Sequence, residues 1–124
     1  MRLTKNFSRD EMKCPCCDAC KMNPTFMAAL QLIRSNVDRP FRINSGYRCE
    51  THNLHIGSRG TRHPKGMAVD ISTLGWPSDD LHYLMFELTS YGSDEHNYKT
   101  GIGIYRSHIH FDFRINDEAL WISL

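Results

Sequence analysis

The chain has 124 residues, of which 40% are hydrophobic and 23% are charged, and its formal net charge at pH 7 is +1. These values predict one folded domain over residues 1–124 and exclude an intrinsically disordered chain. No apolar run approaches the roughly 20 residues that cross a bilayer, so no transmembrane segment is expected. The seven histidines and five cysteines are the residues best suited to bind a transition metal.

The charge is unevenly distributed along the chain. Residues 1–62 carry 11 Lys and Arg against 5 Asp and Glu, whereas residues 63–124 carry 4 against 9. The basic residues of the first half are scattered and no two are adjacent. We therefore interpret them as a solvated surface and predict no nucleic-acid partner. The first residues lack the apolar stretch of a signal peptide, so we expect synthesis in the cytoplasm, where disulfides are disfavoured.

Helix and strand patterns alternate without a regular repeat. Residues 8–11 have capping-box spacing, which predicts a short helical turn, and residues 14–20 follow as a loop. Asn23 and Pro24 predict the start of a helix that runs to about Asn36.

The second half of the chain carries most of the strand patterns. An irregular loop is expected over 47–66, and Ser78 is expected to cap a further helix. A short segment with Trp121 closes the chain. This mixture predicts an α+β fold with a small, mainly antiparallel sheet flanked by helices. The expected strands cover residues 41–44, 67–71, 101–105 and 108–113.

The strand expected at 108–113 carries the most informative pattern. Side chains alternate between the two faces of a strand, so one face is wholly apolar and the other holds two imidazoles and a carboxylate. This composition indicates a functional site, with an ordinary amphipathic strand as the alternative. The apolar face consists of Ile109, Phe111 and Phe113, and the polar face of His108, His110 and Asp112.

Asp70 is the one carboxylate in the short apolar strand expected over 67–71. A carboxylate is costly there unless it is paired or binds a metal. His63 lies seven residues upstream, in a loop that could return over the strand. His63, Asp70 and His110 would then form a two-nitrogen, one-oxygen site with an open fourth position, as catalytic zinc requires. The spacing of these three residues is a weak signal by itself, so this metal site is a hypothesis at this point.

Several short motifs follow one another in a specific order: Ser45-Gly-Tyr-Arg-Cys49, His52-Asn53, Thr61-Arg-His63 with Gly66, Ala68-Val-Asp70, Gly101-Ile-Gly-Ile-Tyr105 and Ile109-His110-Phe-Asp112. In this order the chain resembles the zinc D-Ala-D-Ala carboxypeptidases. That family shares a hedgehog-type fold with vancomycin-resistance dipeptidases and phage L-alanyl-D-glutamate endolysins. The resemblance extends over residues 7–114 and implies the same fold here.

The resemblance implies that His63, Asp70 and His110 bind a catalytic zinc ion. It also implies that Arg48 reaches the substrate, where its charged, forked guanidinium would bind a carboxylate or steady an oxyanion. A surface ion pair is the alternative for Arg48. Asp112 is expected to orient a zinc-binding histidine through the ring nitrogen that does not face the metal.

Ser45 and Asn53 belong to the same motifs. For Ser45 we expect either a hydrogen bond to the loop or the substrate, or a role in forming the turn alone. Asn53 is expected to fix the local backbone rather than to contact the substrate.

The role expected of His108 depends on which of these peptidase branches the chain resembles. The dipeptidases and endolysins have an acidic residue three positions before the last zinc ligand, where this chain has Ser107. The carboxypeptidases instead have His-x-His, which His108 and His110 match. Imidazole titrates near neutrality. We therefore predict that His108 is the catalytic base or stabilises the oxyanion, with a purely structural role as the alternative.

These residues predict a monomeric zinc metallopeptidase that cleaves peptidoglycan stem peptides. The His-x-His motif favours a D-Ala-D-Ala carboxypeptidase, and the small single domain fits an endolysin-type endopeptidase. Release to the cell wall during phage lysis, or transport in a virion, would suit a protein without a signal peptide. A non-catalytic zinc-binding module of the same fold is the alternative. A nucleic-acid-binding zinc knuckle is a third hypothesis, which leaves the polar face of the last strand unexplained.

The five cysteines have no assigned role. Cys14, Cys16, Cys17 and Cys20 form overlapping C-x-x-C pairs within seven residues. One short loop can hardly place four thiolates around a tetrahedral zinc, so a second, structural zinc would need Cys49 or a histidine. A disulfide that involves Cys49 and free thiols are the two alternatives. For the remaining histidines, His52, His55, His82 and His96, we expect ordinary surface or packing roles.

Overall fold

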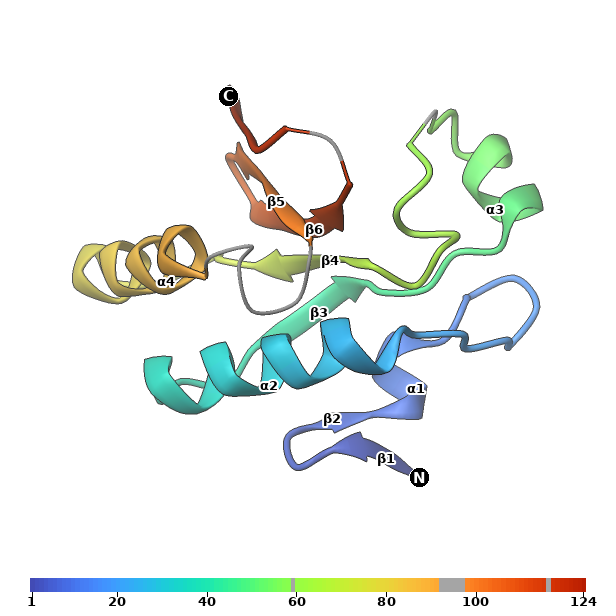
Figure 1. Ribbon diagram of the computed structural model, residues 1–124, viewed down its shortest axis with the longest axis horizontal. Helices are drawn as coiled ribbons and strands as arrows, with labels where there is room; N and C mark the ends of the chain where they lie inside the picture. The colour runs from blue at the N-terminus through green and yellow to red at the C-terminus, as the bar shows by residue number, and fades with distance from the viewer. Residues whose placement is uncertain (59, 92–97, 116) are drawn as a thin grey trace.

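The computed structural model describes residues 1–58, 60–91, 98–115 and 117–124. Figure 1 shows how helices and strands are arranged in this part of the chain. None of the described helices is long and apolar enough to cross a membrane. In chain order the elements are β1 (Arg2–Thr4), β2 (Phe7–Ser8), α1 (Arg9–Met12), α2 (Pro24–Val37), β3 (Arg42–Ser45), α3 (Glu50–His55), β4 (Ala68–Ser72), α4 (Ser78–Ser90), β5 (Lys99–Tyr105), β6 (His108–Arg114) and β7 (Ala119–Ser123).

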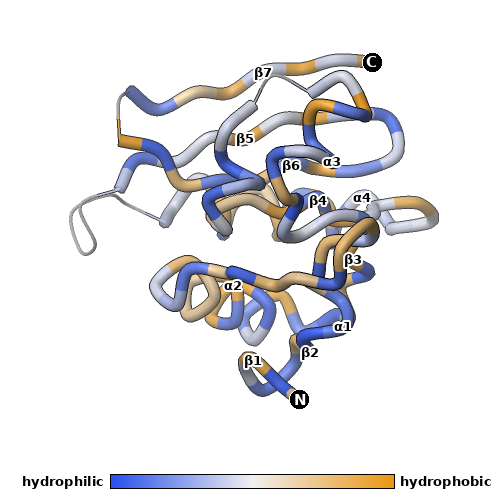
Figure 2. The backbone as a smooth tube through the Cα atoms, turned by 90° about the vertical axis from the view of Figure 1, so that its right-hand side faces the viewer, coloured by the Kyte–Doolittle hydropathy of each residue, from blue (hydrophilic) through white to orange (hydrophobic). Residues whose placement is uncertain are grey.

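A five-stranded sheet in the order β3-β4-β6-β5-β7 forms the centre of the fold (Figure 2). The pairings from β3 to β5 are antiparallel, and β7 joins β5 in parallel. A separate two-stranded sheet pairs β1 with β2. The predicted α+β class with a mainly antiparallel sheet is confirmed. β1, β2 and β7 are additional strands, which lack the clear alternation of apolar and polar residues that marks β6.

Capping side chains begin the first two helices, as predicted. The Ser8 hydroxyl accepts the backbone N–H of Glu11 at 3.2 Å, and the Glu11 carboxylate accepts the N–H of Ser8 at 2.9 Å. The Asn23 side chain accepts the N–H of Phe26 at 3.0 Å and so begins α2. α2 ends at Asp38, which adopts a left-handed conformation with φ of 56°. These contacts confirm the capping box and the start of the long helix.

Two local predictions are wrong. Pro77 rather than Ser78 is the N-cap of α4, and no side chain caps this helix. The carboxylates of Asp79 and Asp80 in its first turn favour the start instead, through the helix dipole. The loop expected over 47–66 contains α3, whose N-cap is the sulfur of Cys49. Cysteine is not a usual N-cap, so the sequence contains no recognisable start for this helix.

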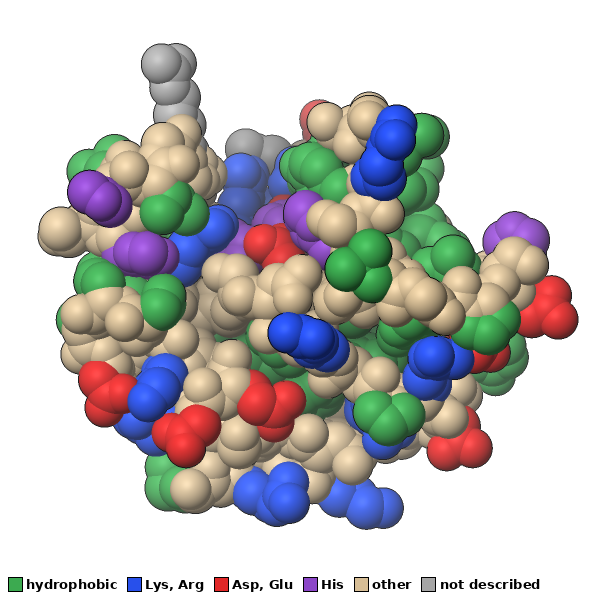
Figure 3. Space-filling view, turned by 180° about the vertical axis from the view of Figure 1, so that it is seen from behind, with side chains coloured by type: hydrophobic (Ala, Val, Ile, Leu, Met, Phe, Trp, Pro, Cys, Tyr) green, Lys and Arg blue, Asp and Glu red, His purple; other side chains and the backbone are tan. Residues whose placement is uncertain are grey.

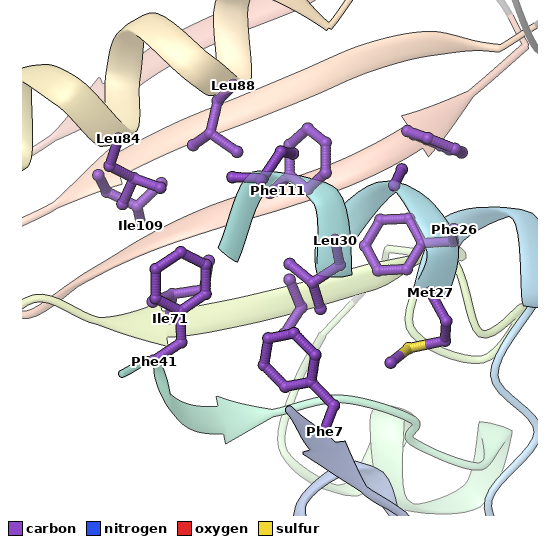
Figure 4. Close-up of a cluster of buried hydrophobic side chains, with 14 of the residues drawn as sticks. Phe7, Phe26, Met27, Leu30, Phe41, Ile71, Leu84, Leu88, Ile109 and Phe111 are labelled. Atoms are coloured by element: carbon purple, nitrogen blue, oxygen red, sulfur yellow. The ribbon is translucent and has the colours of Figure 1, made fainter. Parts of the chain in front are cut away.

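The apolar residues of β6 pack under α2 and α4 (Figures 1 and 4). Phe26 of α2 stacks on Phe111 with ring centroids 5.6 Å apart. Leu84 and Leu88 of α4 are fully buried in the same cluster, near Ile109 and Phe111 in Figure 4. Because alternate residues of a strand face opposite sides, this packing directs the polar residues of β6 to the other face of the sheet.

Candidate active site

The polar face of the sheet brings together two of the predicted metal ligands. β4 and β6 are antiparallel neighbours, and their register places Asp70 opposite His110. His110 Nδ1 lies 2.9 Å from Asp70 Oδ1. Ordinary strand pairing thus joins two side chains that are 40 residues apart in the chain.

His63 approaches this pair from the loop between α3 and β4. Its Nδ1 lies 2.7 Å from the carbonyl oxygen of Gly46. A carbonyl only accepts hydrogen bonds, so Nδ1 carries a ring proton, and in the neutral ring Nε2 presents a lone pair. Nε2 is buried, has no hydrogen-bond partner in the part of the chain that the structure describes, and lies 3.6 Å from Asp70 Oδ2. A buried lone pair that faces a carboxylate is unfavourable unless a cation lies between them.

Asp112 orients His110 from the other side of the ring. His110 Nε2 lies 2.7 Å from Asp112 Oδ2, and the Arg114 guanidinium donates to both Asp112 oxygens at 2.8 and 2.9 Å. Asp112 therefore accepts the Nε2 proton of His110. On the Asp70 side, a second ring proton or a metal ion must separate Nδ1 from the carboxylate. The contact between Asp112 and His110 Nε2 is the one that we expected Asp112 to make.

The three predicted ligands fit a zinc ion. His63, Asp70 and His110 each offer one ligand atom, and these atoms lie within 4.8 Å of one another. Two imidazole nitrogens and one carboxylate oxygen are a donor set that zinc accepts, and three protein ligands leave one position open. The unpartnered His63 Nε2 is the observation that most favours a bound cation.

Burial and hydrogen bonding have opposite effects on the ionisation of this cluster. Burial raises the pKa of Asp70, but the His110 and His63 rings outweigh burial and hold the pKa well below its usual range. Burial also raises the pKa of Asp112, yet His110 and Arg114 lower it to about 2. For His110, burial lowers the pKa, while its carboxylate partners raise it to above the ordinary value. Both carboxylates are therefore ionised at neutral pH.

The cluster lies in a cavity of about 340 Å³. Figure 3 shows histidine, acidic and basic side chains gathered in a hollow on this side of the molecule. A larger cavity of about 580 Å³ lies around Arg39 and Trp76, but the metal-ligand clusters found among the described residues lie elsewhere. The lining of the smaller cavity comprises Arg48, Ser58, Gly60, Arg62, His63, Asp70, Tyr105, His108, His110, Asp112, Arg114 and Trp121.

Arg48 lines this cavity from the turn that follows β3. Its backbone N–H donates to the carbonyl of His63 at 3.4 Å, which joins this turn to the metal-site loop. Its side-chain Nε is buried and has no hydrogen-bond partner among the described residues. Burial lowers the pKa of the guanidinium, and the negative charge of Asp70 opposes this effect. Arg48 is therefore a cation with an unused donor beside the candidate metal site, rather than a surface ion pair.

His108 occupies the same face of β6 as His110 and also lines the cavity. Its ring stacks on that of Tyr105, with centroids 4.4 Å apart and planes 10° from parallel. Its Nδ1 lies 3.0 Å from the Ser107 hydroxyl oxygen. The imidazole is thus oriented at the edge of the cavity, although its catalytic role stays a prediction.

Ser45 and Asn53 are placed outside the described lining of this cavity. Ser45 pairs with Asp70 across β3 and β4. The buried Asn53 donates from Nδ2 to the carbonyl of Gly60 at 2.8 Å, which holds the backbone of a loop that lines the cavity. This position agrees with the expected role of Asn53 in fixing the backbone.

The other histidines stand apart from the metal site. His55 and His82 are exposed and His52 is half-buried. None of these three lines the cavity described above. His96 lies outside the described residues, so its expected surface role is untested.

Arg114, Trp121 and Tyr105 form a wall of the site that the sequence analysis did not assign. The Trp121 indole donates to the Tyr105 hydroxyl at 2.9 Å, and the Arg114 guanidinium carbon lies 5.5 Å from the centre of the Trp121 ring. A Cβ at Gly103 would meet the Trp121 ring at 2.5 to 2.6 Å. Arg114 could have been found by extending the alternation of β6 by two residues. Trp121 could not have been found in this way, because the parallel pairing of β7 with β5 depends on tertiary structure.

Four of the five cysteines form a second cluster of possible metal ligands. The sulfurs of Cys14, Cys16, Cys17 and Cys49 lie within 4.8 Å of one another, and all five cysteines are free. Cys20 is half-buried and packs against the hydrophobic core instead. Cys49 therefore joins the cysteine loop, as a second metal site would require.

The comparison with known families adds evidence that is independent of this geometry. The chain matches the family model of peptidase M15 over residues 5–112. It therefore belongs to the peptidase M15 family, which is zinc-dependent. The predicted relationship to D-Ala-D-Ala carboxypeptidase-like peptidases is confirmed. No curated protein matches the chain.

Proposed function

We propose that this chain is a zinc-dependent peptidase that cleaves peptidoglycan stem peptides. The observation that carries the proposal is the convergence of His63 Nε2, His110 Nδ1 and the Asp70 carboxylate in a cavity that Arg48 and His108 also line. Metal ligands with an open position, a fixed cation and an imidazole are the parts that metal-assisted peptide hydrolysis needs.

Each of the two histidines proposed as metal ligands is held by a partner of its own. Gly46 fixes the tautomer of His63, and Asp112 fixes that of His110. Such partners raise metal affinity because the ligand atoms already point at the metal position. A zinc ion bound there would polarise a carbonyl and lower the pKa of a coordinated water.

Arg48 would bind the substrate. A stem peptide that ends in D-Ala-D-Ala presents a carboxylate, which a guanidinium can bind through two parallel hydrogen bonds. The buried Nε of Arg48 has no hydrogen-bond partner in the described part of the chain, so binding a carboxylate would satisfy it. The cost of leaving this donor unpaired thus becomes a source of substrate affinity.

His108 would move the proton during hydrolysis. Its imidazole lies on the same strand face as His110, and stacking on Tyr105 restricts its orientation. Imidazole can accept a proton from the attacking water and return it to the leaving amine near neutral pH. The same side chain could alternatively donate a hydrogen bond to the developing oxyanion.

Mass spectrometry of cleaved stem peptides tests this proposal. The zinc-loaded chain is incubated with a stem pentapeptide that ends in D-Ala-D-Ala. Loss of one D-Ala identifies a carboxypeptidase, and a break between L-Ala and D-Glu identifies an endolysin-type endopeptidase. His110→Ala should abolish cleavage and His82→Ala, on the exposed face of α4, should preserve it. Failure of the zinc-loaded chain to cleave any wall peptide would contradict the proposal and favour a non-catalytic zinc-binding module.

A further inference from the structure

The cysteine cluster lies where two separate segments meet. Cys14, Cys16 and Cys17 belong to the loop that follows α1, and Cys49 is the N-cap of α3. In Figure 1 this loop runs beside the connection from β3 to α3. The cluster is outside the lining of the candidate active-site cavity, so these cysteines form a separate candidate site.

The distances between the sulfurs match those around one metal ion. Cys14 Sγ lies 3.6 Å from Cys16 Sγ and 3.7 Å from Cys49 Sγ, and Cys16 Sγ lies 3.3 Å from Cys49 Sγ. Sulfurs that surround a tetrahedral zinc at about 2.3 Å lie about 3.8 Å from one another. A disulfide joins only two sulfurs, at about 2.0 Å, and so explains a pair rather than a group of four.

The backbone of the loop holds the first three sulfurs in place. The N–H of Cys14 donates to the carbonyl of Ala19 at 2.7 Å, and the N–H of Asp18 donates to the carbonyl of Cys14 at 3.1 Å. Asp18 has a φ of 63°, which turns the chain sharply, and its carboxylate lies 2.7 Å from the ammonium of Lys13. These contacts close the loop without the help of the sulfurs, so the thiols are arranged in advance.

Two of the sulfurs accept hydrogen bonds from backbone amides. The N–H of Cys49 lies 3.4 Å from Cys14 Sγ, and the N–H of His52 lies 3.4 Å from Cys49 Sγ. These bonds hold the sulfurs of Cys14 and Cys49 in fixed positions beside those of Cys16 and Cys17.

We propose that Cys14, Cys16, Cys17 and Cys49 bind a second zinc ion with a structural role. Four thiolates complete the coordination of zinc and leave no position open for a substrate, unlike the site of His63, Asp70 and His110. Zinc is favoured over harder divalent ions because all four ligands are sulfur. This inference does not depend on the proposed peptidase activity.

The second ion would join the segments that hold the candidate active site. The N–H of Tyr47 donates to the carbonyl of Met12 at 2.8 Å, and the N–H of Asn23 donates to the carbonyl of Gly66 at 2.9 Å. The segment that contains the cysteine loop is therefore attached at its start to the turn that carries Arg48 and at its end to the loop that carries His63. Cross-linking it to Cys49 would limit the movement of the adjacent Arg48.

Metal analysis of purified variants tests this second site. The wild-type chain, reduced and dialysed against zinc, should hold two zinc ions. Cys16→Ser combined with Cys17→Ser should hold one, and the two changes affect exposed side chains, so folding should persist. Cys20→Ser is the matched control and should still hold two. His63→Ala combined with His110→Ala should also hold one ion, which separates the two sites.

Cobalt substitution identifies the ligands of the remaining ion. The His63→Ala, His110→Ala variant loaded with Co²⁺ should show strong near-ultraviolet absorption from thiolate-to-cobalt charge transfer, and the Cys16→Ser, Cys17→Ser variant should lose that absorption. The proposal would be overturned if the two cysteine changes left the zinc content unaltered. It would also be overturned if the freshly purified protein contained a disulfide within the cluster, or iron in place of zinc.

Discussion

Asp70 and His110 face each other across β4 and β6, with 2.9 Å between Asp70 Oδ1 and His110 Nδ1. The opposite ring nitrogen of His110 donates to Asp112, so the contact with Asp70 requires a cation or a second ring proton. His63 Nε2, buried and unpartnered, faces the other oxygen of the same carboxylate. Three donors that converge in this way have the arrangement expected of ligands to one metal ion.

Asp112→Asn should weaken zinc binding by about 10- to 100-fold. The side chain keeps its size, but its amide NH₂ or its neutral oxygen replaces the carboxylate that accepts from both His110 and Arg114. Competition with a fluorescent zinc chelator measures the change, and Asp117→Asn, an exposed carboxylate, is the control. Unchanged zinc affinity in Asp112→Asn would show that this contact does not orient the ligand.

His108→Gln should lower kcat by about 10²- to 10⁴-fold, the usual contribution of a general acid or base. Zinc content should not change, because His108 is outside the group of three converging ligands. Steady-state kinetics and metal analysis on the same preparation separate these two effects. Loss of zinc together with activity would mean that His108 is a ligand rather than a proton carrier.

Arg48→Lys should reduce kcat/KM by about 10²- to 10³-fold, a loss similar to that of an oxyanion donor. Lysine keeps the positive charge but loses the planar fork that binds a carboxylate through two bonds. Arg42→Lys, on the exposed side of β3, should retain full activity. Equal kinetics for Arg48→Lys and the wild-type chain would remove Arg48 from substrate binding.

Gly103→Ala should destabilise the chain by about 1–3 kcal/mol, because an added methyl group would overlap the Trp121 ring. Displacement of Trp121 should also change its fluorescence. Gly60→Ala is a control for stability, since a Cβ there would come no closer than 3.7 Å to the Ser58 hydroxyl oxygen. Urea denaturation followed by fluorescence measures both variants, and equal midpoints would contradict the close packing of Trp121.

The sequence predicted the parts of the site that depend on local patterns. Alternation along residues 108–113 placed His108, His110 and Asp112 on one face, and the structure confirms this because Ile109 and Phe111 are buried on the other. The capping residues Ser8 and Asn23 likewise begin their helices as predicted. These features follow from the period of the backbone and from short-range hydrogen bonds.

Three other features of the structure were not predicted. Trp121 reaches the site only because β7 pairs in parallel with β5, which no local pattern indicates. α3 begins at the sulfur of Cys49, a residue that rarely caps a helix. The separation of Cys20 from the other four cysteines depends on packing against the core rather than on spacing.

Anomalous diffraction at the zinc absorption edge, from crystals of the zinc-loaded chain, shows directly whether His63, Asp70 and His110 bind zinc. We predict a peak at bonding distance from His63 Nε2, Asp70 and His110 Nδ1, with nitrogen ligands at about 2.0–2.1 Å. That peak should disappear in crystals of His110→Ala. A map of the zinc-loaded wild-type chain without density between these three side chains would contradict the assignment of this cluster as the catalytic metal site.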